Sequence, residues 1–210
     1  MSVETSRDQR QPLTAERLKS FTDAVVAIAM TLLILPLMES LGDAADEGLL
    51  AGTWLSGEWP QLFSFALSFV LTAIFWIIHH RLFDRVQHVT IALLWLSLAW
   101  MLTIVWLPVA TGLVGQLAID PVQKVLYIGT LLATSLILLA MRIYMRRHSE
   151  LHAIPDDRQR EGMIGAVTMS ALFAAALVLA VAVPAVGYLA LFLVLLTVPL
   201  TGWLSRPRRR

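Results

Sequence analysis

The sequence contains no cysteine among its 210 residues, and charged residues make up only 15% of it. The missing thiols exclude disulfide frameworks, thiolate-bound metals, iron–sulfur clusters and cysteine nucleophiles. Soluble domains carry about 25% charged and about 45–50% apolar residues, whereas 58% of this chain is hydrophobic. The composition therefore excludes an ordinary soluble domain and predicts a protein that crosses a membrane several times.

Motifs that carry enzyme chemistry are also missing from the sequence. It has no glycine-rich phosphate loop, no His-Glu-x-x-His, no serine flanked by elbow glycines and no carboxylate pair within its uncharged runs. His79 and His80 are adjacent, but no third ligand has suitable spacing, and we interpret them, like His88, as interfacial residues. We predict that the chain is not an enzyme and holds no metal and no cofactor.

Long uncharged runs alternate with charged segments along the chain, and about 20 apolar residues suffice to cross a bilayer. We predict an all-α integral membrane protein with six transmembrane helices. It would have a tail at 1–16, a transmembrane domain at 17–205 and a basic tail at 206–210. Pro184 and Gly187 predict a turn that divides the last uncharged run into two spans. The six helices are expected at about 17–38, 59–79, 88–112, 122–144, 162–183 and 185–204, with an acidic loop at 39–58.

The basic residues indicate the orientation of these spans. With a cytoplasmic N-terminus, Lys124 is the one basic residue of the 16 that falls outside. The positive-inside rule therefore predicts two cytoplasmic termini and a location in the cell membrane. The tail Arg206–Arg210 is too short to bind nucleic acid, and we expect it to contact anionic lipid.

Asp23 lies near the start of the first predicted span, where a carboxylate needs a stabilising partner because intramembrane charges are costly. The helix macrodipole favours an anion in the early turns, and Lys19 lies four residues back on the same face. A histidine at the end of the second span, His79 or His80, is a further candidate partner. On these grounds alone, an interfacial carboxylate with a purely structural role remains an alternative.

Ile28, Leu32 and Leu35 follow at helical spacing and form one stripe along the same helix. Asp23 lies five residues before Ile28, about 140° around the helix axis, so the two side chains point in different directions. If one of them lines a pore, the other packs against neighbouring helices. From spacing alone, an aliphatic stripe is more typical of contact with lipid or another helix.

The pattern Arg17-x-x-x-Phe21-Thr22-Asp23, followed by Ala27-Ile28-x-x-Thr31-Leu32-Leu33, resembles the Arg-x-x-x-Phe-Ser-Asp signature of the endolysosomal potassium channel family. Trp76-x-x-His79-His80-Arg81-Leu82-Phe83 and Leu107-Pro108 also match. The chain is most similar to the bacterial six-helix members, which lack the internal duplication of the animal channels. The likeness is specific in the first three helices and architectural in the last three.

The resemblance implies a homotetramer in which the first helix of each subunit lines a central pore. Rings of aliphatic side chains would replace the carbonyl filter of other potassium channels. Carried over by position, the rings are Ile28, Leu32 and Leu35, and Thr31 matches a threonine linked to cation preference. A structural network would hold the first three helices together; its members would be Arg17, Phe21, Thr22, Asp23, Trp76, His79 and Ser97. Thr22 replaces the signature serine, and Ser97 replaces an asparagine common in the third helix.

The expected function is passive, potassium-preferring flux through a hydrophobic constriction, with K⁺ as the permeant ion and the bilayer and other copies of the chain as partners. Three alternatives remain. A proton leak would use Asp23 and His79. A non-conducting structural or accessory protein would bury the Ile28 stripe against a neighbour. A small-molecule transporter would need broken midplane helices, of which Pro36, Pro108, Pro184 and Pro199 are the only signs.

Overall fold

The computed structural model of the chain describes residues 15–118, 120–183 and 187–204. Most of the predicted N-terminal tail, the basic tail 206–210 and the predicted turn at Pro184 lie outside these residues. Within them the backbone is helical, and its one β-type pairing is an isolated bridge between Val86 and His152. The all-α class is therefore as predicted.

Eight α-helices and two 3-10 helices are formed by the described residues. The α-helices are α1 (Ala15–Leu32), α2 (Leu35–Asp46), α3 (Ala51–Gly57), α4 (Trp59–Phe83), α5 (Ile91–Gln116), α6 (Pro121–Arg147), α7 (Asp156–Ala182) and α8 (Thr197–Leu204). The 3-10 helices are η1 (Ser149–Leu151) and η2 (Gly187–Leu196).

Five stretches of the described chain are long and apolar enough to cross a membrane: Ala15–Asp46, which joins α1 and α2, and then α4, α5, α6 and α7. A shorter apolar segment formed by η2 and α8 occupies the place of the predicted sixth span. The protein is thus a multi-helix membrane protein, and the count of six spans remains a prediction.

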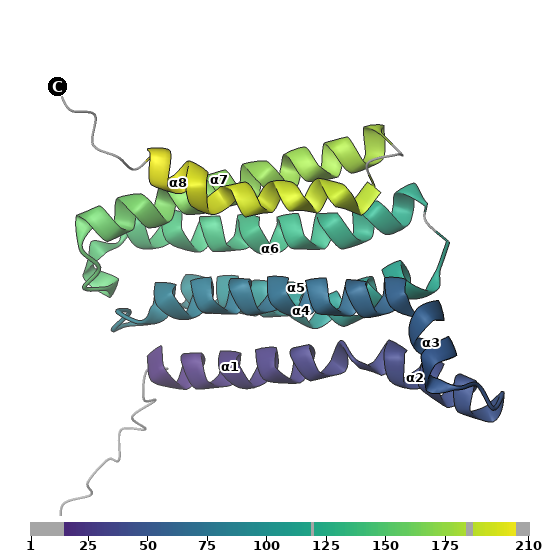
Figure 1. The fold of residues 1–210 in the computed structure, drawn as a ribbon. Helices are drawn as coiled ribbons and strands as arrows, with labels where there is room; N and C mark the ends of the chain where they lie inside the picture. Colours follow the sequence, from purple (N-terminus) through teal and green to yellow (C-terminus); the bar gives the residue numbers. More distant parts are fainter. Residues whose placement is uncertain (1–14, 119, 184–186, 205–210) are drawn as a thin grey trace, which may run out of the picture.

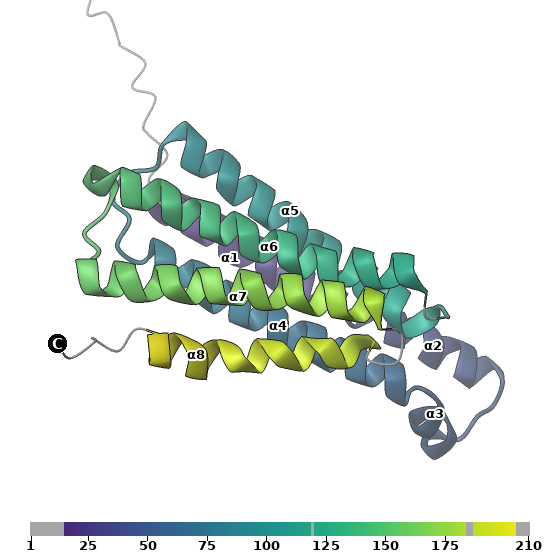
Figure 2. The ribbon, with the colours of Figure 1, turned by 90° about the horizontal axis from the view of Figure 1, so that it is seen from above.

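The long helices lie side by side in an up-and-down bundle. Figure 1 shows α1 along one side, α4 and α5 next to it, then α6, with α7 and α8 on the side farthest from α1. Helix α6 packs extensively against α5 and α7, whereas α1 packs against α4 and α5. Figure 2, seen from above, shows α7 beside both α6 and α8. Helix α1 therefore borders the bundle, and α6 lies within it.

Basic residues are concentrated at one of the two ends of the bundle, whose helices Figure 1 shows side by side. At the basic end, α1 and α7 begin and α4 and α6 end; it carries Arg17, Lys19, Arg81, Arg85, Arg142, Arg146, Arg147, Arg158 and Arg160. The opposite, acidic end carries Glu39, Asp43, Asp46, Glu47, Glu58 and Asp120 together with Lys124. Which of the two ends faces the cytoplasm remains a prediction from the positive-inside rule.

Side-chain caps define the turn between α5 and α6. Asp120 accepts a hydrogen bond from the backbone N–H of Gln123 (2.6 Å), which satisfies a free donor at the start of α6. The Gln123 amide in turn donates to the carbonyl of Leu113 near the end of α5. Lys124 donates from Nζ to the carbonyl of Ala180 (3.1 Å), so its buried charge caps the last turn of α7.

The predicted acidic loop at 39–58 is largely helical in the structure. Helix α2 continues to Asp46, and α3 occupies Ala51–Gly57. Two contacts explain this: α2 buries Leu37 and Ala44, and the Trp54 indole on α3 donates to the hydroxyl of Ser40 on α2 (3.0 Å). The first predicted span is also interrupted, because α1 ends at Leu32 and α2 begins at Leu35.

Candidate functional site

Helix α1 has one buried face, which packs against α4 and α5. The residues that form this face are Ala15, Leu18, Thr22, Val26 and Ala29. Thr22 is 1% exposed and donates its hydroxyl to the carbonyl of Leu18 (2.8 Å), which hides the polar atom within its own helix. The small side chains of this face let α1 approach the bundle closely, as is typical of membrane helices.

The opposite face of α1 has no partner among the described residues. Ile28 is 60% exposed, and Leu35 and Leu32 are 49% and 36% exposed. Thr31 is also exposed, and its hydroxyl donates to the carbonyl of Ile28 (2.7 Å). The open stripe, defined as Ile28, Thr31 and Leu32 on α1 and Leu35 at the start of α2, is therefore a surface that the described residues do not cover.

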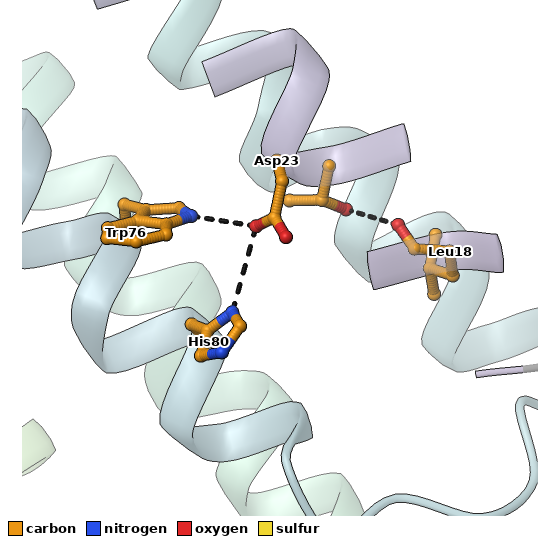
Figure 3. Close-up of polar contacts among 5 residues, drawn as sticks. Leu18, Asp23, Trp76 and His80 are labelled. Atoms are coloured by element: carbon orange, nitrogen blue, oxygen red, sulfur yellow. Dashed lines mark hydrogen bonds and ion pairs between the residues drawn. The ribbon is translucent and has the colours of Figure 1, made fainter. Parts of the chain in front are cut away.

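Asp23 is directed toward α4, as its position about 140° from Ile28 predicts. Its Oδ1 accepts a hydrogen bond from the Trp76 indole (2.7 Å) and lies 3.8 Å from Nδ1 of His80 (Figure 3). Asp23 and His80 are both partly exposed, with side chains 41% and 47% accessible. The carboxylate thus attaches α1 to α4 by a charge-assisted hydrogen bond and lies away from the open stripe.

His79 occupies a different environment from His80, although the two residues are adjacent. Its ring is 2% exposed and stacks between Trp100, at 4.3 Å between centroids, and Phe83, at 4.5 Å. Its Nε2 is buried with no hydrogen-bond partner among the described residues. His79 therefore packs α4 against α5, and it is His80 that contacts the carboxylate of Asp23.

The remaining members of the predicted network are dispersed. Arg17 is exposed, and Phe21 is 55% exposed on α1. Ser97 is buried in α5 and donates to the carbonyl of Leu93 in its own helix (2.9 Å). Among the described residues, the polar bonds therefore join Asp23, Trp76 and His80 and connect none of Arg17, Phe21, His79 and Ser97.

The helix break between α1 and α2 lies within the open stripe, between Leu32 and Leu35. Pro36 has no N–H, so the carbonyl of Leu32 lacks the donor that a continuous helix would supply. Pro36 packs close to Gly112 of α5, where an added Cβ would come within 3.4 Å of the proline ring. Pro36 therefore accounts for the helix break beside the aliphatic side chains of the stripe.

A polar pocket of about 600 Å³ lies at the acidic end, between α2, α3 and the start of α4. Four carboxylates line it, and the lining includes no basic residue: Glu39, Asp43, Glu47 and Glu58. No group of three or more metal-ligating side chains occurs in the described ranges. The pocket therefore concentrates negative charge without the geometry of a metal site.

Two features of this region carry no clear signal in the sequence. The direct bond between Trp76 and Asp23 joins residues 53 positions apart, and helical spacing does not determine which residues of two helices meet. A buried hydroxyl cluster joins α4, α5 and α6, in which Ser68 lies 2.7 Å from the Tyr127 hydroxyl and accepts a bond from Thr111 (2.8 Å). The pairing of hydroxyls between membrane helices depends on helix rotation, which single-chain spacing does not determine.

Comparison with known proteins identifies relatives of the first half of the chain. Residues 17–108 match the family described as the endosomal/lysosomal potassium channel TMEM175. Over 102 residues the chain is 32% identical to a potassium channel of Streptomyces collinus, covering 48% of this chain and 47% of that protein. Over 94 residues it is 36% identical to the endosomal/lysosomal proton channel TMEM175 of Homo sapiens, covering 42% and 18%.

A solved structure extends the similarity to nearly the whole chain. The crystal structure of a lysosomal potassium-selective channel TMEM175 homolog from Chamaesiphon minutus superposes with a TM-score of 0.58. The match covers 91% of this chain and 94% of that one at 24% identity, so it shows a shared fold. In sequence, the chain spans about half the length of the first curated relatives it matches. Because the matched family consists of ion channels, the prediction that the chain is not an enzyme is confirmed.

Proposed function

Because residues 17–108 carry the sequence of the TMEM175 ion-channel family, we propose that the chain is a potassium-preferring cation channel of the cell membrane. Four copies assemble around a central pore, with α1 of each subunit lining it. Ions pass down their gradient through a hydrophobic constriction formed by Ile28, Leu32 and Leu35. Both termini face the cytoplasm, and the bilayer and other copies of the chain are the partners.

The observation that carries this proposal is the open stripe on α1. Its four residues are exposed at the edge of the bundle, while Asp23 on the other side of α1 is bonded to α4. A ring of such side chains narrows a pore without offering ligands to ions, and it can open and close by wetting and dewetting. The threonine adds a hydroxyl to the stripe.

Two further features support passage of a cation. The carboxylates of the acidic pocket, at the end of α1–α2 away from the basic end, raise the local cation concentration. The helix break between Leu32 and Leu35 is a second feature, because interrupted membrane helices can offer backbone carbonyls to ions. Selectivity is expected to be modest, because the sequence has no rigid carbonyl filter.

Proton permeation is the second candidate function, and a specific contact favours it. Asp23 and His80 lie 3.8 Å apart, are both partly accessible and can each exchange protons. Relatives of the chain include proteins named as proton channels and others named as potassium channels. A proton route would use the contact between α1 and α4, whereas potassium would use the open stripe.

The experiment that separates the two functions measures reversal potentials of purified protein in liposomes under opposed K⁺, Na⁺ and pH gradients. A potential that follows K⁺ supports the pore, and one that follows only pH supports the route through Asp23 and His80. Absence of any current in the wild type and in the stripe variant described next would contradict both functions and favour a non-conducting protein.

Ile28→Asn tests the constriction directly. The amide is polar and similar in size, so it should wet the narrowest ring and raise the potassium conductance several-fold. Val178→Asn is the matched control, because Val178 is 67% exposed and belongs to α7, which lies on the side of the bundle farthest from α1 (Figure 1). Unchanged flux and selectivity in Ile28→Asn, with normal protein yield, would show that Ile28 does not form the constriction.

A further inference from the structure

A second pocket, at the basic end, is lined by charged side chains that the channel proposal does not use. Its volume is about 430 Å³, and it lies between the ends of α4 and α6 and the start of α7. Four arginines line it with two carboxylates: Arg81, Arg85, Arg142 and Arg158, with Asp84 and Glu161. Within the described ranges none of these arginines forms an ion pair, because the one ion pair there joins His80 to Asp23. The pocket therefore carries an excess of positive charge.

Arg142 is the most deeply placed of these arginines. It lies in the last turns of α6, and its Nε is buried with no hydrogen-bond partner among the described residues. Its guanidinium lies directly over Gly162 of α7, where an added Cβ would clash with Nη1. Arg142 is half-buried, and a guanidinium nitrogen that is buried without a partner is unfavourable, so this side chain is expected to receive an anion.

An apolar groove begins next to this pocket and extends along the bundle. It has a volume of about 390 Å³ and lies between α4, α7 and η2, with Leu67, Ile74, Met169 and Leu195 among its lining residues. Arg81 is the charged residue of this lining, and Arg81 also lines the arginine pocket. The two spaces thus share the side chain of Arg81. The arginine pocket supplies positive charge at the basic end, and the apolar groove extends from it along the bundle.

We propose that the arginine pocket and the apolar groove together bind one anionic phospholipid. Its phosphate lies against Arg142 and Arg81, and one acyl chain occupies the groove between α4 and η2. Guanidinium groups bind phosphate through paired N–H donors, and basic pockets between membrane helices are known sites for anionic headgroups. One wall of the groove is α7, which Figure 1 shows on the side of the bundle farthest from α1, where lipid would remain accessible around an assembly centred on α1.

The combination of the two spaces distinguishes a phospholipid from a soluble anion. Inorganic phosphate or a nucleotide would contact the arginines but leave the apolar groove unfilled. A zwitterionic lipid would fill the groove, but its added positive charge would face four arginines. A headgroup with net negative charge and an attached acyl chain satisfies both the charge of the pocket and the apolar lining of the groove.

Native mass spectrometry of the full purified chain, titrated with palmitoyl-oleoyl phosphatidylglycerol, tests this proposal. Phosphatidylcholine with the same acyl chains is the comparison lipid, and glycerol 3-phosphate represents the headgroup alone. Phosphatidylglycerol should bind more tightly than either. Arg142→Gln should weaken its binding by about tenfold, the effect expected from loss of one charge-assisted hydrogen bond.

Arg146→Gln is the matched control, because Arg146 lies one turn later on the same helix, is exposed and does not line the pocket. It should leave phosphatidylglycerol binding unchanged. Ile74→Trp, which fills the groove about two helical turns before Arg81 on α4, should also weaken binding. Should Arg142→Gln fail to fold, the exposed Arg81 provides the same test as Arg81→Gln.

Three results would overturn the proposal. Equal binding of phosphatidylcholine and phosphatidylglycerol would show that the arginines do not select the headgroup. Equal losses of phosphatidylglycerol binding in Arg142→Gln and Arg146→Gln would show that general surface charge, and not the pocket, attracts the lipid. Binding of glycerol 3-phosphate as tight as that of the whole lipid would show a soluble-anion site in which the groove has no part.

Discussion

Helices α6 and α1 are both apolar enough to span a membrane, yet they are buried to different extents. In α6, 44% of the most apolar window is buried inside the chain, whereas only 22% of the corresponding window of α1–α2 is buried. The residues of α6 contact neighbours on several sides, and those of α1 do so on one. Helix α6 is therefore stabilised within a single chain, and α1 leaves a face for lipid, a pore or another subunit.

The two helices also differ in how they use polar side chains. Tyr127 and Thr134 on α6 are buried and bond to hydroxyls on neighbouring helices, Ser68 and Thr103. On α1, Thr31 is exposed and bonds only to its own backbone. Polar groups thus join helices where α6 is buried, while within the part of the chain that the structure describes the open stripe forms no polar contact with another helix.

The largest expected effect on stability is at the centre of α6. Leu131 is fully buried, and Leu131→Ala should lower the free energy of unfolding by about 2 kcal/mol. That value is at the low end for such substitutions. In a membrane the hydrophobic effect does not drive helices together, so the substitution removes only the packing contacts of Leu131. Denaturant unfolding in detergent micelles would measure it. Leu102→Ala, at a position 70% exposed on α5, is the control and should change little; equal losses would contradict the burial of α6.

A smaller effect is expected where α1 is attached to α4. Trp76→Phe removes the bond from the indole to Asp23 and should cost about 1 kcal/mol, below the usual range for bonds to charged groups because Asp23 is partly exposed. Thermal unfolding of the purified protein would measure this loss. Trp95→Phe is a matched control, because Trp95 is 67% exposed. A similar loss of stability in both variants would indicate that the indole ring itself, and not the bond from its N–H to Asp23, stabilises the protein.

Much of the fold could be predicted from hydropathy alone. The long uncharged runs match α4, α5, α6 and α7. At the basic end, α4, α6 and α7 extend past the predicted ends into charged residues, which continue a helix beyond the apolar part of the membrane. The helical content of the segment after Glu39 could not be predicted, since it depends on the contact between Trp54 and Ser40 across two short helices. Local composition there indicates only a polar segment.

The candidate site was accessible to sequence reasoning in part. Helical spacing predicts that Asp23 and Ile28 face different directions, because both belong to one helix. The choice between His79 and His80 could not be made in the same way. Adjacent residues differ by about 100° around a helix, and which of them meets Asp23 depends on the rotation of α4 against α1. The resemblance assigned His79 to the network, whereas the structure places His80 beside Asp23.

A third, still smaller effect should come from the hydroxyl cluster of α6. Tyr127→Phe removes the bond to Ser68, and hydrogen bonds between membrane helices contribute about 0.6 kcal/mol on average. Tyr188→Phe is the control, because the Tyr188 hydroxyl is buried without a hydrogen-bond partner among the described residues. Its removal should leave stability unchanged or improve it. Denaturant unfolding would measure the free energy of unfolding of both variants. A larger loss in Tyr188→Phe than in Tyr127→Phe would show that the Tyr188 hydroxyl stabilises the fold and that the bond from Tyr127 to Ser68 does not.

The smallest effect on stability, and a distinct effect on flux, is expected at the open stripe. Leu35 is 49% exposed, and Leu35→Ala should change the free energy of unfolding by no more than about 0.5 kcal/mol, as is usual for exposed positions. If Leu35 lines a pore, the shorter side chain should widen it and raise the potassium current in liposomes. If the stripe instead packs against another subunit, Leu35→Ala should weaken the assembly and lower its mass in detergent. It should then cause no increase in the potassium current. The pair of measurements, mass and current, therefore decides whether the exposed face of α1 borders water or protein.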